Sequence, residues 1–457
     1  MANNKHLIIT EYQRITTGEN LGEHYKTVTQ TQFDALEAFV LSNELEDASN
    51  YLKLGQRGNQ KFLQAQNYIG VIQLKEGLTV EILPKIARKT GDSNHDDVRS
   101  IVINMLKTLR DSPFKQVNTA SLKTHKMPLL ELFISMFMQA TEQLIRRGIR
   151  SDYIPCEENS AFLKGKLLFS QNLKHNLVHK ERFYVAFDNY LPNRLENRLI
   201  KNTLLLLYKL SASSRNQQRI REALFIFDDI DAVRDVKSVF SKLRLNRQMK
   251  DYEQLMAWSR LFLLGNSFTP HKGNAVAFSL LFNMNMLFES YVGAYFKKHF
   301  SGHVSLQHRR YHLAKRDTDP IFALRPDIVI DSGKIVTDAK WKLLDSNKSN
   351  AGISQADMYQ MYAYATKYQE KDSECEVIYL IYPATENTRD ISTNYSFEGV
   401  NHNKGVRLKV VFFDLTNDTL NYPIDLGGNG DITSFVLNQP LDKSDLGNNP
   451  DHSPQKI

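Results

Sequence analysis

Cysteine is nearly absent from this 457-residue chain, which has only Cys156 and Cys375. The two lie far apart and neither belongs to a C-x-x-C pair, so the sequence indicates neither a disulfide framework nor a zinc site. This usage suits a reducing, intracellular compartment. The 13 histidines are scattered and form no H-E-x-x-H motif, which argues against a zinc protease.

Long apolar runs and targeting signals are also missing. The longest apolar run, LLLLYKL near Leu204, is too short to span a bilayer. The N-terminal MANNKHLIITEYQ lacks the charged-then-apolar order of a secretory signal. We therefore expect a cytoplasmic protein that has no contact with membranes.

A phosphate-binding loop is absent as well. Neither Lys164-Gly165-Lys166 nor Ser332-Gly333-Lys334 has the upstream glycine that a G-x-x-x-x-G-K-[ST] motif requires. Any nucleotide hydrolysis must therefore come from another chain. The balance of 58 basic against 51 acidic residues gives a net charge of +7, which suits a nucleic-acid partner without requiring one.

The order of sequence patterns predicts an α/β protein of α+β multidomain type. We expect a β-rich domain over 1–88, a polar linker over 88–97, a mainly helical domain over 98–268, an α/β domain over 271–440 and a disordered tail over 441–457. Within the helical domain, 160–173 and 181–190 are strand-like. The α/β domain begins with a helix over 275–300, followed by a strand pair, a helix and two strands.

A hairpin is predicted in the first domain by NYIGVIQLKEGLTVEILPKI, in which apolar residues alternate on either side of a turn. Its apolar residues are expected in a core. Its charged residues are expected at the turn and at strand edges: Lys75, Glu76, Glu81 and Lys85.

A second hairpin is predicted by RPDIVIDSGKIVTDAKWKLLD, residues 325–345. Its second strand places Asp338 and Lys340 on one face, because side chains alternate along a strand. Asp327 begins the first strand, within cross-strand reach of Asp338. A pair of strands that is otherwise apolar thus carries two carboxylates and a lysine.

Like charges in such a place need an explanation. Two carboxylates about 5 Å apart repel by about 3 kcal/mol at an effective dielectric of ~20. Lys340 can neutralise one carboxylate, and a divalent metal such as Mg²⁺ can satisfy both. The plain alternative is that the D-x-K triplet is a chance match, or that its charges protect an edge strand from aggregation.

Two flanking helices carry further polar candidates. Glu289 lies in the predicted helix before the hairpin, where a solvated helix charge is the plain alternative. After the hairpin, Ser354 and Asp357 have capping-box spacing. Gln360 and Tyr364 then lie at i and i+4 on one helix face, where core packing would explain the tyrosine equally well.

The hairpin resembles the PD-(D/E)XK nuclease signature, here Pro326-Asp327 followed by Asp338-Ala339-Lys340. The resemblance implies a mixed sheet flanked by helices, with Asp327, Asp338 and the Ala339 carbonyl at a Mg²⁺ or Mn²⁺ site and Lys340 beside it. Glu289 matches the first-helix glutamate of such nucleases. Gln360 and Tyr364 resemble the Gln-x-x-x-Tyr element of RecB-like members.

Two other stretches resemble McrC-type subunits of the McrBC 5-methylcytosine-dependent restriction system. One is Gly70–Ile86, and the other is a central block with a Gly-Lys strand, a Phe-Asp pair and an Asn-Arg helix start: Gly165, Lys166, Phe187, Asp188, Asn197 and Arg198. The resemblance implies that this chain cuts DNA. It also implies that the N-terminal region engages a hexameric AAA+ GTPase of the McrB type, which binds the GTP and reads modified cytosine.

Three hypotheses follow. The leading one is a Mg²⁺-dependent type IV restriction endonuclease subunit. The others are a non-catalytic adaptor that binds DNA and stimulates the GTPase, and a stand-alone RecB-like repair nuclease. A basic stretch at 307–316, including Arg309 and Arg310, either contacts DNA phosphates or forms a solvated face.

Overall fold

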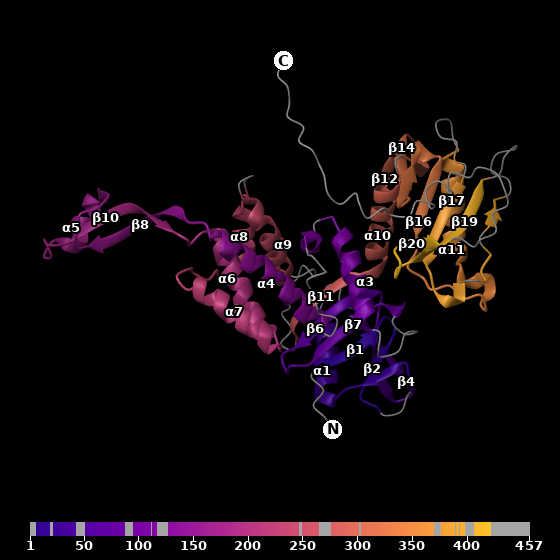
Figure 1. Cartoon of the computed structure of the whole chain (residues 1–457), viewed down its shortest axis with the longest axis horizontal. Helices are drawn as coiled ribbons and strands as arrows, with labels where there is room; N and C mark the ends of the chain where they lie inside the picture. The colour runs from indigo at the N-terminus through magenta and orange to yellow at the C-terminus, as the bar shows by residue number, and fades with distance from the viewer. Residues whose placement is uncertain are drawn as a thin grey trace, which may run out of the picture. The chain divides into compact units, whose positions relative to one another are not determined.

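The computed structural model forms two compact units, residues 1–287 and 288–457 (Figure 1). It describes residues 6–18, 22–42, 51–86, 95–110, 112–116, 127–245, 249–264, 276–300, 303–369, 375, 377–388, 390–392, 394–397 and 406–421. Most of the predicted linker at 88–97 and all of the predicted tail at 441–457 lie outside this part of the chain. Among the described helices, none has the length and apolar character needed to cross a membrane.

A four-stranded sheet begins the first unit. Its order is β1 (His6–Thr10), β7 (Thr79–Leu83), β6 (Tyr68–Leu74) and β11 (Val276–Asn283). β1 runs parallel to β7, and the other neighbours are antiparallel. The β6–β7 pair confirms the first predicted hairpin.

The strand β11 corrects the helix predicted over 275–300. Residues 276–283 pair with β6 in the first unit, and α10 (Met284–His299) begins only afterwards. Gly70 makes this pairing possible. A Cβ there would lie 2.0 Å from the Leu280 carbonyl oxygen, and its φ is +136°, so only glycine fits.

A second sheet completes the core of this region. Its order is β3 (Tyr25–Thr27), β2 (Arg14–Thr16), β5 (Gln60–Ala65) and β4 (Leu52–Arg57), and α1 (Gln30–Ser42) packs with it. Phe33 and Leu36 of α1 share one apolar cluster with Leu63, Ile72 and Leu281. Because this cluster includes β11, residues 1–88 do not enclose their own core.

Helices form most of the remaining first unit, as predicted. They are α3 (His95–Thr108), α4 (Leu129–Arg147), α6 (Leu195–Leu210), α7 (Ser214–Ile226), α8 (Val236–Lys242) and α9 (Lys250–Leu264). Trp258 is fully buried, with ring contacts to Phe114, Phe133 and Phe262.

A long antiparallel hairpin extends beyond these helices (Figure 1, left). It pairs β8 (Asp152–Ser160) with β10 (Phe183–Leu191) along their whole length. A short β9 (Lys166–Leu167) and α5 (Phe169–Asn176) lie between them. β10 confirms the strand predicted at 181–190, whereas most of 160–173 is not a strand, and β8 was not predicted.

The second unit is built on a seven-stranded mixed sheet. Its order is β12 (Val304–Leu306), β15 (Ile328–Ile330), β16 (Ile335–Ala339), β17 (Val377–Pro383), β19 (Arg407–Asp414) and β18 (Asn394–Ser396), with β20 (Thr419–Asn421) also on β19. β16, β17 and β19 are parallel, and β15 and β16 form the predicted antiparallel hairpin. A separate two-stranded pair joins β13 (His312–Arg316) to β14 (Asp319–Ala323).

Helices cover both faces of this sheet. Phe288 of α10 contacts the rings of Trp341 and Phe413 on one face. α11 (Gln355–Lys367) packs Met361 and Tyr364 into an apolar cluster that contains Val336 of the opposite face. The predicted mixed α/β fold is thereby confirmed.

Candidate active site

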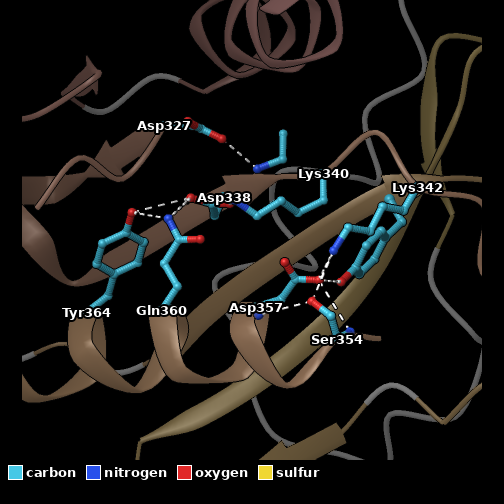
Figure 2. A network of polar contacts seen from close by, with 10 residues as sticks. Asp327, Asp338, Lys340, Lys342, Ser354, Asp357, Gln360 and Tyr364 are labelled. Atoms are coloured by element: carbon cyan, nitrogen blue, oxygen red, sulfur yellow. Dashed lines mark hydrogen bonds and ion pairs between the residues drawn. The ribbon is translucent and has the colours of Figure 1, made fainter. Parts of the chain in front are cut away.

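The predicted site residues Asp327, Asp338 and Lys340 come together on the β15–β16 hairpin (Figure 2). Asp327 directly precedes β15, and Ile328 is opposite Thr337, so Asp338 lies beside Asp327 across the strands. The Asp327 carboxylate accepts a 2.8 Å hydrogen bond from the Ala339 backbone N–H. Asp338 is only 1% exposed, which removes its carboxylate almost completely from water.

Lys340 supplies a positive charge to this pair. Its Nζ lies 2.5 Å from Asp338 Oδ2. The Lys340 backbone N–H donates to the Ile381 carbonyl, which extends the parallel pairing of β16 and β17 by one residue and fixes the lysine. Burial by itself lowers the pKa of Lys340, but the Asp338 carboxylate outweighs it and the pKa is raised. The lysine therefore stays charged.

Negative charge exceeds positive charge in this site. Burial, followed by the charges of Asp338 and Glu289, raises the pKa of Asp327 to about 8. Burial also raises the pKa of Asp338, against the opposing effect of Lys340. Two carboxylates that both resist ionisation, with a single lysine paired to Asp338, form a site that a cation would stabilise.

The helix α11 holds Asp338 from one side. Gln360 Nε2 donates to Asp338 Oδ1 over 3.4 Å, and the Tyr364 hydroxyl donates to the same oxygen over a long 3.5 Å. Gln360 also donates to the Tyr364 hydroxyl over 2.7 Å. The prediction that these two side chains share a helix face is confirmed, and Figure 2 shows both pointing toward Asp338.

The start of α11 is fixed by a polar network that the sequence indicated only in part. The predicted capping box of Ser354 and Asp357 is confirmed. Lys342 Nζ donates to Asp357 over 2.6 Å and to Ser354 over 3.0 Å, and the Tyr382 hydroxyl donates to Asp357 over 3.3 Å. Lys342 was missed: it lies beyond the end of β16, where its backbone N–H donates to the Lys340 carbonyl over 2.9 Å and the alternation of side chains along a strand no longer holds.

Glu289 approaches the site from α10 through an intermediary. It accepts a 2.7 Å hydrogen bond from Gln307 Nε2, and the Gln307 backbone N–H donates to the Asp327 carbonyl over 2.8 Å. Gln307 has a φ of +48°, which is uncommon for a residue other than glycine. No sequence pattern pointed to Gln307, because its role depends on two segments distant in the chain.

A divalent cation fits this donor set. Among the described residues, no group of three or more His, Cys, Asp and Glu side chains lies close enough to hold a metal, so Glu289 is not grouped with the two aspartates. Asp338 Oδ2 is buried and, within the same residues, accepts no hydrogen bond and has only its ion pair with Lys340. Two carboxylates and a backbone carbonyl, completed by water, are ligands that Mg²⁺ prefers.

The predicted DNA-contacting residues, Arg309 and Arg310, are exposed and follow Gln307 in the chain. They therefore lie on a segment that starts at the site but are not part of the carboxylate cluster.

Comparison with known proteins gives the family. A model for a component of the McrBC 5-methylcytosine restriction system matches residues 63–383, which is most of the chain. The chain belongs to the McrBC family. The resemblance to the McrBC restriction system is thereby confirmed.

Two relatives within the McrBC group extend the comparison. A curated protein of Escherichia coli (strain K12), described as the type IV methyl-directed restriction enzyme EcoKMcrBC, is 22% identical over 285 residues, covering 59% of this chain and 80% of that protein. A solved half-complex of Thermococcus gammatolerans McrB AAA+ hexamers with bound McrC matches with a TM-score of 0.64, covering 90% of this chain and 95% of that chain. At 17% sequence identity the second match shows the fold alone.

Proposed function

We propose that this chain is the DNA endonuclease subunit of a modification-dependent restriction complex and hydrolyses phosphodiesters with Mg²⁺ or Mn²⁺. The observation that carries the proposal is the arrangement of Asp327, Asp338 and Lys340 at the start and end of two paired strands, with both carboxylate pKa values raised. A purely structural hairpin gains nothing from buried like charges, whereas a metal site requires them.

Asp327, Asp338 and the Ala339 carbonyl would hold the ion. When bound, it supplies positive charge that lowers the pKa of a bound water and offsets charge on the phosphate. Lys340, held by Asp338, orients the attacking water or stabilises the charge that develops on the phosphate oxygens. Gln360 and Tyr364 keep Asp338 in position from α11.

The family match supports a partner that is an AAA+ hexamer, which we call the motor. The Thermococcus gammatolerans structure is described as McrB AAA+ hexamers with bound McrC, and the Escherichia coli relative as methyl-directed. We propose the same classes of partner for this chain: an AAA+ hexamer that binds and hydrolyses GTP, and DNA that contains modified cytosine. The chain has no phosphate loop of its own, which fits this division of labour.

The β8–β10 hairpin is the better candidate for the motor contact than the N-terminal region. Val71, Ile72, Val80 and Ile82 of the N-terminal hairpin are buried in the core and present nothing to a partner. In contrast, the region between β8 and β10 exposes six large apolar side chains: Phe162, Leu163, Phe169, Leu173, Leu177 and Val178. Apolar surface of this extent on a soluble protein indicates a binding site.

The nuclease proposal is tested by Asp338→Ala. Loss of a metal ligand is expected to abolish cleavage of methylated DNA by the complete complex with GTP, while assembly with the motor stays intact. Glu386→Ala is a matched control, because Glu386 is an exposed carboxylate of the same unit. Normal cutting by a folded Asp338→Ala protein would remove the site assignment and favour the adaptor hypothesis.

Calorimetric titration with Mg²⁺ separates the remaining alternatives. Binding that is lost in Asp338→Ala supports a metal enzyme, and stimulation of the partner's GTP hydrolysis by a wild-type chain that binds no metal supports an adaptor. Cleavage by the purified chain without motor or GTP would favour a stand-alone repair nuclease instead.

A further inference from the structure

The segment between Gln307 and Asp327 leaves the active site and returns to it. At its base, the Gln307 backbone N–H donates to the Asp327 carbonyl over 2.8 Å. One step further out, the Leu324 N–H donates to the Tyr311 carbonyl over 2.8 Å. The antiparallel pair β13–β14 then follows (Figure 1). Both ends of this segment are therefore held by hydrogen bonds next to Asp327, a proposed metal ligand.

Aromatic contacts fix the same segment to α11. His308 Nδ1 lies 2.6 Å from the Tyr368 hydroxyl, and the rings of Tyr311 and Tyr368 meet at 4.7 Å. Tyr368 directly follows α11, the helix whose Gln360 donates to Asp338. The base of the β13–β14 pair is thus held from two sides, by the chain that leads into Asp327 and by the residue that follows α11.

The surface of this segment is basic and partly apolar. Residues 308–326 carry five Lys and Arg residues and two Asp residues, which gives a net charge of +3 with histidine neutral: Arg309, Arg310, Lys315, Arg316 and Arg325 against Asp317 and Asp319. All of these side chains are exposed. Leu313 is 53% exposed and Phe322 is 69% exposed on the same strand pair.

Phe322 is the least expected residue on this surface. Its φ is +57°, in the left-handed region, where a bulky side chain is a genuine outlier. An exposed ring gains little from burial to offset this strain, and glycine or asparagine would fit the backbone better. Backbone strain of this kind is concentrated at functional sites, so the strain at an exposed Phe322 indicates a binding role.

We propose that the β13–β14 pair is a DNA-contacting element, an inference that rests on the proposed nuclease function. Arg309, Lys315 and Arg316 bind backbone phosphates on either side of the scissile bond, and Phe322 makes the non-ionic contact with sugars or bases in the groove. Cations interspersed with an exposed aromatic ring fit a nucleic acid, because every phosphate is anionic and every base has an apolar face. The excess positive charge and the tie to Asp327 favour DNA over the motor protein as the occupant.

Duplex binding at several salt concentrations tests the ionic part. The full chain is mixed with a fluorescein-labelled duplex in EDTA, so that no cleavage occurs, and anisotropy gives Kd. Each phosphate contact contributes about 0.9 to the slope of log K against log salt. The variant Arg309→Ala/Lys315→Ala/Arg316→Ala is expected to lower that slope by about three. Arg221→Ala on α7, an exposed arginine of the first unit, is expected to leave it unchanged.

Substitutions of Phe322 test the non-ionic part. Phe322→Asn suits the left-handed backbone, so the thermal midpoint should stay the same or rise, while duplex affinity should fall about ten-fold without a change in salt slope. Phe322→Tyr keeps the ring and should retain affinity. Phe225→Ala is the matched control, because Phe225 is an aromatic residue of α7 that is 84% exposed.

The outcomes separate this inference from the nuclease proposal. If the wild-type chain binds no duplex under any of these conditions, the nuclease proposal itself is undermined and the inference falls with it. If the wild-type chain binds the duplex and both the arginine–lysine variant and the Phe322 variant of the β13–β14 pair bind it equally well, only the inference is overturned. If these variants bind the duplex normally but no longer stimulate the partner's GTP hydrolysis, the β13–β14 surface contacts the motor instead.

Discussion

Asp327 shows at the scale of a single residue how function conflicts with stability. Its carboxylate is mostly out of water and faces Asp338 and Glu289, so the charged form is disfavoured and its pKa is raised to about 8. Between its unfolded pKa near 3.8 and about 8, the folded metal-free chain binds a proton that the unfolded chain releases. The stability contributed by this proton is complete below the lower value and is lost as the pH rises through about 8.

We therefore predict the effect of Asp327→Asn on the metal-free protein. Asparagine can still accept the Ala339 N–H but carries no charge, so the stability of the variant relative to wild type should rise as the pH rises from about 4 to about 8 and level off above that. Mg²⁺ should raise the thermal midpoint of wild type and not that of the variant. Thermal unfolding in EDTA and in Mg²⁺ across this pH range is the measurement. An unchanged difference between the proteins at all pH values would contradict the assignment.

A buried ion pair connects secondary-structure elements in the first unit. Glu81 of β7 is fully buried and accepts from Arg99 of α3 through both oxygens, at 2.7 and 3.0 Å. His6 of β1 lies 2.9 Å from the same carboxylate. Burial alone would raise the pKa of Glu81, but the hydrogen bonds from His6 and Arg99 outweigh it and lower the pKa. The pair therefore fixes α3 on the sheet.

Arg99→Ala should destabilise the first unit by about 3–5 kcal/mol, because it leaves the Glu81 carboxylate buried without its main partner. Since the folded pKa of Glu81 is below its ordinary 4.5, its contribution is present above that value and is lost as the pH falls below it. Urea unfolding at pH 7 and at pH 4 measures both effects. The double variant Glu81→Leu/Arg99→Met should recover much of the loss at pH 7; no recovery would mean that the ion pair is not the cause.

At the scale of the whole molecule, the question is how the proposed functions are divided among its parts. Deletion of the residues before Arg88 would not test whether the N-terminal region contacts the motor, because the first unit would lose part of its core. β6 pairs with β11, and the apolar cluster includes Leu281. Removing those residues would leave β11 without its sheet. Point substitutions on exposed apolar side chains avoid this problem.

We predict that Phe162→Ser/Leu163→Ser/Leu173→Ser abolishes stimulation of the partner's GTP hydrolysis and leaves Mg²⁺ binding unchanged. The three side chains are between 61% and 79% exposed, so folding should not suffer. Leu41→Ser tests the N-terminal region, because Leu41 lies on α1 and is 63% exposed. GTPase rates with each protein decide between the two surfaces. Loss of stimulation with Leu41→Ser alone would return the motor contact to the N-terminal region.

Features that arise from short stretches of chain follow from the amino-acid sequence alone. The β15–β16 hairpin, the capping box of Ser354 and Asp357, and the shared face of Gln360 and Tyr364 each depend on residues a few positions apart. Alternation along strands and the i, i+4 spacing of helices fix such relations locally. For the same reason, the sequence alone groups the two aspartates and the lysine of the hairpin as one site.

Contacts between distant segments, in contrast, become evident only in the folded chain. Residues 276–283 have an apolar pattern compatible with helix or strand, and pairing with β6 made them a strand. The sequence predicts Glu81 to be a charge at a strand edge. In the fold its carboxylate is buried, because Arg99 and His6 form ion pairs with it. Gln307 links Glu289 to the Asp327 backbone, although nothing in its own stretch of sequence marks it. Contacts between residues far apart in the chain depend on packing and on strand partners, which no local period encodes.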